Sequence, residues 1–166
     1  QFGTSMCYPI SSFGAHVAAR PRTSLKTRGN VAMCGTFGYE LDPRKLTDDE
    51  KAEVKQQIAD YRKYHRLVRE GDFYRLVSPT ENDFYCAWEF VSPDKQEAMM
   101  TAVVMRQPEI RYCVQRLRGL DPKTYYQDEE TGTVYSGAML MNAGLNLTRD
   151  VYEDGTSVTK HFKAVK

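Results

Sequence analysis

A change of hydrophobic period at Gly71 constrains the fold of this chain more than any other feature of the sequence. Before it, Thr47 to Glu50 form a capping box that predicts the start of a helix. A stripe at helical spacing follows, made of Val54, Ile58, Tyr61, His65 and Val68. Gly71 comes after a basic last turn and is expected to end the helix in the left-handed conformation. The pattern predicts one long helix over residues 48–70.

After Gly71 the period becomes that of β-strands. In 84–91 and again in 99–105, the side chains of every second residue are expected to point to the same face. Shorter runs of the same kind lie at 73–77, 112–117, 134–135, 138–141 and 158–165. Turn residues such as Ser92-Pro93-Asp94 and Thr131-Gly132 separate them. The sequence therefore predicts a mainly β chain with one long helix, in which an antiparallel sandwich or barrel follows the helix.

The leading stretch, residues 1–42, has a different composition. It is rich in Gly, Ser and Thr, contains a basic segment at Arg20–Arg28 that is expected to be a loop, and shows no closed core of its own. The first residue is Gln1 rather than Met, and no basic-then-apolar leader follows it. We expect the chain to be part of a longer product.

Charge and composition exclude several classes of function. The sequence has 23 Lys and Arg against 22 Asp and Glu, a net charge of +1, which argues against binding nucleic acid through phosphates. Its longest uncharged stretch, Gln1 to Ala19, contains no continuous apolar run that would span a membrane. The four cysteines and three histidines are too scattered for a zinc site, so we expect no metal, no cofactor and reduced thiols in a cytoplasmic protein.

No local motif for hydrolysis, phosphate binding or dinucleotide binding appears in the sequence. The turn residue Glu129 is expected to be solvated, and Glu89 is expected to face water opposite the apolar side of its strand. Trp88, the only tryptophan, lies between apolar residues and is expected to pack in the core. The residues alone thus predict a β-rich domain behind a long helix, without an active site of its own.

Four segments carry a resemblance to a known family. Gly3–Val17 and Lys26–Asp42 resemble the last strand regions of the barrel in the α-galactosidases of glycoside hydrolase family 36. Gly71–Pro79 and Tyr135–Leu145 resemble segments that family members show after the same capped helix. The resemblance extends over essentially the whole chain.

The resemblance implies a division of the chain. Residues 1–70, including the capped helix 48–70, would be the C-terminal end of a (β/α)₈ catalytic barrel, and residues 71–166 an antiparallel β-sandwich. It also implies a retaining α-galactosidase acting on melibiose or raffinose, and a homo-oligomer. The family's two catalytic aspartates, one in a Lys-Trp-Asp motif, would precede Gln1. No catalytic residue is therefore expected in this chain, which would be structural and inactive alone.

Two residues are candidates for contact with substrate. Barrel enzymes bind at the carboxyl ends of their strands. If a strand lies near Tyr8–Ser12, then Ser12 and His16 border that rim, where a turn that only closes the barrel is the alternative. The sequence departs from the family at 18–23, where a loop is shorter and lacks the Pro-Asn-His-Gln pattern. That departure weakens any inference about rim or subunit contacts.

Two other readings stay open. A stand-alone carbohydrate-binding sandwich would present Trp88, Tyr125 and Tyr126 as stacking platforms and bind galactosides without catalysis. A purely structural module would cover the barrel or join subunits, and would expose a large apolar surface when isolated.

Overall fold

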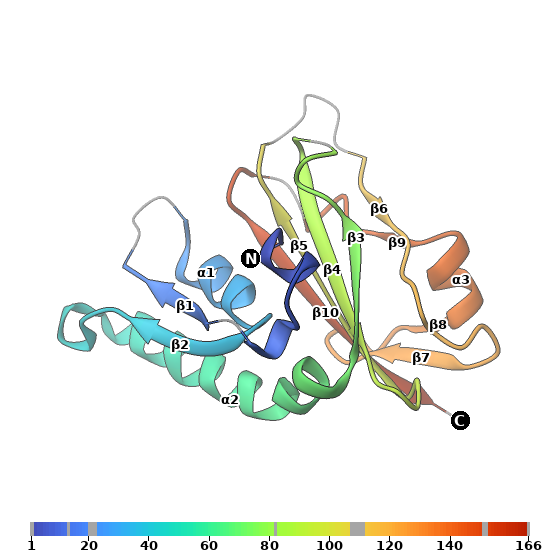
Figure 1. Cartoon of the computed structure of the whole chain (residues 1–166), viewed down its shortest axis with the longest axis horizontal. Coiled ribbons are helices and arrows are strands. Elements are labelled where there is room, and N and C mark those ends of the chain that lie inside the picture. Colours follow the sequence, from blue (N-terminus) through green and yellow to red (C-terminus); the bar gives the residue numbers. More distant parts are fainter. Residues whose placement is uncertain are drawn as a thin grey trace.

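Six strands form the large sheet around which the chain is organised (Figure 1). The computed structural model describes residues 2–12, 14–19, 23–81, 83–106, 112–150 and 153–165. The sheet order is β3-β4-β5-β10-β7-β8, and every neighbouring pair is antiparallel. The strands are β3 (Asp72–Val77), β4 (Tyr85–Val91), β5 (Glu97–Val104), β7 (Tyr125–Asp128), β8 (Val134–Ser136) and β10 (Ser157–Val165). The mainly β fold predicted for this part is confirmed.

The large sheet is covered on both faces. One face packs against a small second layer, built from β6 (Val114–Gln115), β9 (Leu145–Asn146) and helix α3 (Gly137–Asn142). The other face packs against the long helix α2 (Asp48–Glu70) and the 3₁₀ turn η2 (Ile10–Ser12). Because both faces are buried, β4 and β5 are apolar at nearly every position.

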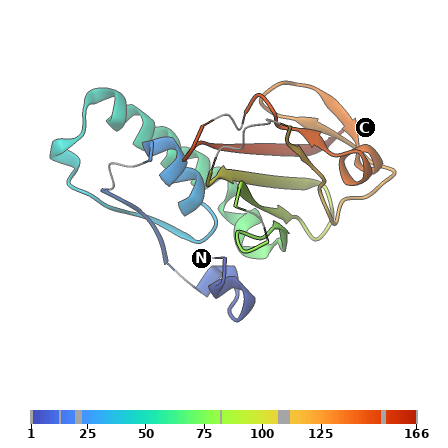
Figure 2. The same cartoon turned by 90° about the horizontal axis from the view of Figure 1, so that it is seen from above.

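A second, smaller sheet lies to one side of the large one (Figures 1 and 2). It pairs β1 (Gly14–Ala18) in parallel with β2 (Thr36–Glu40). Helix α1 (Leu25–Ala32) connects the two strands, as parallel pairing requires, and contacts both β1 and β10. Two short 3₁₀ turns, η1 (Thr4–Met6) and η3 (Pro43–Lys45), complete the elements of residues 2–12 and 23–81.

Helix α2 confirms the predicted capping box. The Thr47 hydroxyl accepts from the Glu50 backbone N–H, and the Glu50 carboxylate accepts from the Thr47 N–H. The predicted left-handed stop is wrong, because Gly71 has φ −76° and ψ 154°. Glycine is needed there for space, since a Cβ would lie 2.5 Å from the Leu67 carbonyl oxygen and 2.9 Å from that of Val91.

The buried face of α2 differs in part from the predicted stripe. His65 is exposed, whereas Gln57 is buried. The Gln57 amide donates to the carbonyl of Leu25 and accepts from the Tyr39 hydroxyl. A Cβ on Gly29 would lie 2.4 Å from this amide, so the glycine lets α1 approach α2. A polar residue thus holds the two helices together.

Three local predictions are wrong. Residues 138–141 belong to α3 rather than to a strand, because the Ser136 hydroxyl caps a helix by accepting from the Met139 N–H. Residues 25–28 of the predicted basic loop begin α1, capped by Ser24, while Arg20 to Arg22 lie outside the described residues. No strand covers Tyr8–Ser12, since β1 begins at Gly14.

Within the described residues, no helix is long and apolar enough to cross a membrane.

Candidate functional site

No described helix packs against one face of the β1–β2 pair. Ala15 and Val17 point toward the helices and are completely buried, together with partly buried Phe37 and Tyr39. Side chains alternate along a strand, so the opposite face carries the intervening residues. These residues, which we call the open face, are Gly14, His16, Ala18, Thr36, Gly38 and Glu40. It is the only face of the small sheet that no described helix covers.

An ion pair occupies the open face. His16 Nδ1 lies 2.8 Å from Glu40 Oε1, and the two side chains are 43% and 64% exposed. The pairing in register of Ala18 with Glu40 explains the reach, because it places Glu40 one diagonal step from His16.

Two glycines make room for the imidazole. A Cβ on Gly38 would lie 2.9 Å from His16 Cδ2, and one on Gly14 would lie 3.2 Å from Cε1. The ring therefore lies flat over the two strands rather than standing out from them. The sequence analysis proposed His16 but missed Glu40. The available signal was the alternation of Thr36, Gly38 and Glu40, which puts Glu40 on the same face as His16 once the strands are paired.

Ser12 lies apart from this ion pair. It belongs to η2, before the amino end of β1, and its exposed hydroxyl donates to the Pro9 carbonyl at 2.7 Å. The structure therefore does not bring Ser12 and His16 together at the carboxyl edge. The suggested substrate contact of Ser12 stays a prediction.

Of the three aromatic candidates in the large sheet, Trp88 and Tyr126 are buried, whereas Tyr125 is 56% exposed. Trp88 is 8% exposed and packs with Phe90, Met99 and Leu67, which confirms the predicted core position. Tyr126 is completely buried, and its hydroxyl donates to the Lys95 carbonyl. Neither aromatic ring offers a platform for a sugar.

Glu89 contradicts its prediction, since it is completely buried rather than facing water. One carboxylate oxygen accepts from the Arg118 backbone N–H at 2.9 Å, and the other has no hydrogen-bonding partner among the described residues. Burial raises the pKa of Glu89 to about 8, although the hydrogen bond from Arg118 opposes the rise. The side chain thus carries a proton at neutral pH.

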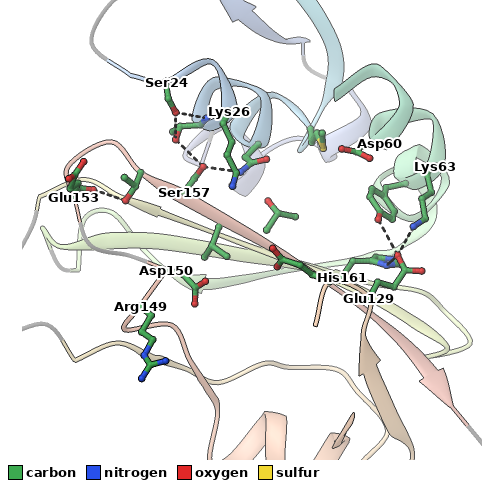
Figure 3. Close-up of a pocket in the computed structure, with 18 residues that line it drawn as sticks. Ser24, Lys26, Asp60, Lys63, Glu129, Arg149, Asp150, Glu153, Ser157 and His161 are labelled. Atoms are coloured by element: carbon green, nitrogen blue, oxygen red, sulfur yellow. Dashed lines mark hydrogen bonds and ion pairs between the residues drawn. The ribbon is translucent and has the colours of Figure 1, made fainter. Parts of the chain in front are cut away.

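A polar pocket of about 710 Å³ lies between α1, α2 and β10 (Figure 3). At one end of it, His161 is 6% exposed and lies between two carboxylates. Its Nδ1 is 2.7 Å from Glu129 and its Nε2 is 2.6 Å from Glu97. Both ring nitrogens of His161 thus face carboxylate oxygens.

Glu129 is also bound by Lys63 of α2 and by Lys163 of β10. Burial would raise the pKa of Glu129, but the hydrogen bonds from both lysines and the charge of His161 outweigh it and hold the pKa at about 2. Glu129 lies in an exposed turn, as the sequence suggested, but its side chain is 26% exposed and is bound by these partners. This network ties α2 to the large sheet.

Comparison with known proteins places these features in a family. The family model described as melibiase matches residues 1–71, and that of the glycosyl hydrolase family 36 C-terminal domain matches residues 85–162. The chain is 49% identical over 154 residues to α-galactosidase AgaA of Geobacillus stearothermophilus, a match that covers 89% of this chain and 21% of that protein.

Solved structures of related proteins superpose on nearly the whole of this chain. The galactosidase domain of the α-galactosidase–sucrose kinase AgaSK superposes with a TM-score of 0.94 at 40% identity, over 99% of this chain and 24% of that chain. A complex of Geobacillus stearothermophilus AgaA with raffinose superposes with a TM-score of 0.92 at 45% identity, over 99% of this chain and 24% of the AgaA chain. This chain spans about a quarter or less of the length of these relatives. Because two family models match successive parts of the chain and solved family structures superpose on nearly all of it, the chain belongs to glycoside hydrolase family 36.

Proposed function

We propose that this chain is the C-terminal part of a retaining α-galactosidase that hydrolyses terminal α-galactosides such as melibiose and raffinose. The open face of the β1–β2 pair is the observation that carries the proposal. Two parallel strands joined by a helix, with helices on one face only, are the unit from which a (β/α)₈ barrel is built. The α-galactosidase relatives, one of them in complex with raffinose, support the substrate class.

In this proposal the two sheets belong to different parts of the enzyme. Residues 1–70 supply the last strands and helices of the catalytic barrel, and residues 71–166 form the C-terminal domain that covers it. The buried contacts of α2 with β4 and β5, together with the Lys63–Glu129 ion pair, would hold the two parts in a fixed arrangement.

The chemistry proposed for the whole enzyme is a double displacement. A carboxylate nucleophile forms a covalent galactosyl intermediate, and a second carboxyl group protonates the leaving oxygen and then activates water. By family resemblance both are aspartates outside this chain, so no residue here takes either role. The contribution of this chain is to complete the barrel wall, with His16 on the wall that faces the substrate.

Further parts of the proposal rest on the family alone. We infer a cytoplasmic homo-oligomer that needs no cofactor and binds neither nucleic acid nor membranes. A separate carbohydrate-binding module is not favoured, because Trp88 and Tyr126, two of its three stacking platforms, are buried and only Tyr125 is exposed.

The test compares the 166-residue chain with the product of its whole gene. The assay is release of p-nitrophenol from p-nitrophenyl α-galactoside and of galactose from raffinose. The expected result is hydrolysis by the whole product, with retention of the α configuration in the first-formed galactose, and none by the isolated chain. Hydrolysis by the isolated chain, or none by a folded whole product, would overturn the proposal.

A further inference from the structure

Glu40 stands at the edge where a barrel binds its ligand. It is the last residue of β2, and Ala18, its partner in register, is the last residue of β1. In parallel barrels the carboxyl ends of the strands meet at one face, and substrate binds there. Glu40 therefore lies at the carboxyl edge of the open face, while Ser12 precedes the amino edge.

The orientation of His16 points to Glu40, rather than to the imidazole, as the group presented to a ligand. Nδ1 of His16 is directed at Glu40, toward the carboxyl edge. Nε2 lies closer to the glycines, 3.5 Å from the position of a Cβ on Gly14 and 3.4 Å from one on Gly38, whereas Nδ1 is 3.9 Å from the former. Because Gly14 is the first residue of β1, the free nitrogen of the ring is turned back from the edge.

The carboxylate keeps unused hydrogen-bonding capacity. One oxygen of Glu40 lies 2.8 Å from His16 Nδ1, and His16 is its only side-chain partner among the described residues. The side chain is 64% exposed. An ionised carboxylate has about four acceptor sites and no donor. What fits such a group is a neutral ligand that offers several O–H donors, which is the chemistry of a sugar ring.

We propose that Glu40 accepts hydrogen bonds from hydroxyl groups of the bound galactoside, and that His16 is the positioning residue that holds its carboxylate in place. The inference rests on the proposed function and deepens it. The contact that the family resemblance suggested for His16 then acts through Glu40. The competing arrangement is a second ion pair, in which Glu40 binds a cationic side chain of the remaining barrel and never meets the sugar.

The experiment uses the whole enzyme and measures kcat and KM for raffinose together with Tm. Glu40→Ala removes the acceptor, and Glu40→Gln keeps the shape without the charge. Glu70→Gln is the matched control, because Glu70 is also exposed and paired with one basic residue, Arg66, but lies on α2. We expect kcat/KM to fall about 10- to 100-fold in Glu40→Ala and about tenfold in Glu40→Gln, since hydrogen bonds to charged groups have effects of this size. The control should stay within twofold.

The positioning role has its own readout. His16→Asn keeps an N–H donor near the position of Nδ1, whereas His16→Leu does not. We expect a larger loss of kcat/KM in His16→Leu than in His16→Asn, and no further loss when His16→Leu is added to Glu40→Ala. This non-additivity is expected only if His16 acts through Glu40.

The outcomes separate the two levels of the proposal. An active wild-type enzyme whose Glu40→Gln variant has the wild-type Tm and a kcat/KM within twofold of wild type would overturn the inference alone. A loss of Tm in both Glu40 variants with unchanged KM would also overturn it, in favour of the second ion pair. A folded wild-type enzyme that hydrolyses no α-galactoside would instead refute the proposed function.

Discussion

Replacing Glu89 by glutamine should remove a loss of stability that the wild-type chain undergoes as the pH rises. The pKa of Glu89 rises from an ordinary 4.5 to about 8 in the folded state because the carboxyl group is completely buried. Between these two values the folded state holds a proton that the unfolded state has lost. The free energy of unfolding therefore falls by about 1.4 kcal/mol for each pH unit as the pH rises. Below pH 4.5 and above about pH 8, the contribution of Glu89 to the free energy of unfolding no longer changes with pH.

The magnitude follows from the pKa difference. Over the whole window, ionisation of Glu89 costs about 5 kcal/mol of stability, and at pH 7 it costs about 3 kcal/mol. Glutamine cannot ionise and keeps an oxygen that accepts from the Arg118 N–H. Its unpaired amide N–H groups add a constant cost of about 1–3 kcal/mol. That cost lowers the free energy of unfolding of Glu89→Gln equally at every pH, so it does not change how that free energy depends on pH.

The assay is urea unfolding at pH 5 and pH 8, followed by the fluorescence of Trp88, the only tryptophan and a buried residue. The expected result is a wild-type stability that drops by several kcal/mol more than that of Glu89→Gln between the two pH values. All other titrating groups are shared, so they cancel in the comparison. An equal drop in both proteins would refute the assignment of a neutral, buried Glu89.

Other residues give further expectations. Glu129→Gln should lower the free energy of unfolding at pH 7 by about 1 kcal/mol, because it weakens the network that ties α2 to the sheet and the two lysines of that network are half exposed. Since the pKa of Glu129 is held at about 2, this contribution is lost as the pH falls from 4.5 toward 2, and acid titration followed by circular dichroism should show a matching difference between variant and wild type. Gly38→Ala should displace the His16 ring, because its Cβ would lie 2.9 Å from Cδ2, and lower kcat/KM of the whole enzyme as His16→Leu does, whereas unchanged kinetics would contradict the packing described. The isolated chain should associate through the open face of the β1–β2 pair, so light scattering after size exclusion should give masses above one chain, and a clean monomer would count against this.

The long helix and most strands were predictable from sequence because their signals are local. The capping box at Thr47 fixes the start of α2 by hydrogen bonds within four residues. The runs at 84–91 and 99–105 have strand periodicity along their own length, and both form strands. Helix α3 escaped prediction because a run of four apolar residues fits a strand or a helix equally well, and the capping role of Ser136 decided it.

The predictions that were wrong or missing concern residues whose surroundings are set by tertiary contacts. Glu89 looked like the polar side of a half-exposed strand, but a second layer covers that face of the sheet. Gly71 looked like a left-handed stop, yet it is the approach of the Leu67 and Val91 carbonyls that requires glycine. Glu40 was not predicted as a site residue, because its place beside His16 depends on the parallel register of two strands, and the two residues are more than twenty positions apart in the sequence. No local pattern contains that register.

The most direct test of the account is to read the coding sequence upstream of the Gln1 codon. The account predicts an open frame that runs into this chain and contains a Lys-Trp-Asp motif, a second Asp-rich motif and the remaining barrel strands. A start codon immediately before the Gln1 codon, or an upstream frame without these two motifs, would contradict the claim that this chain completes the barrel of an α-galactosidase.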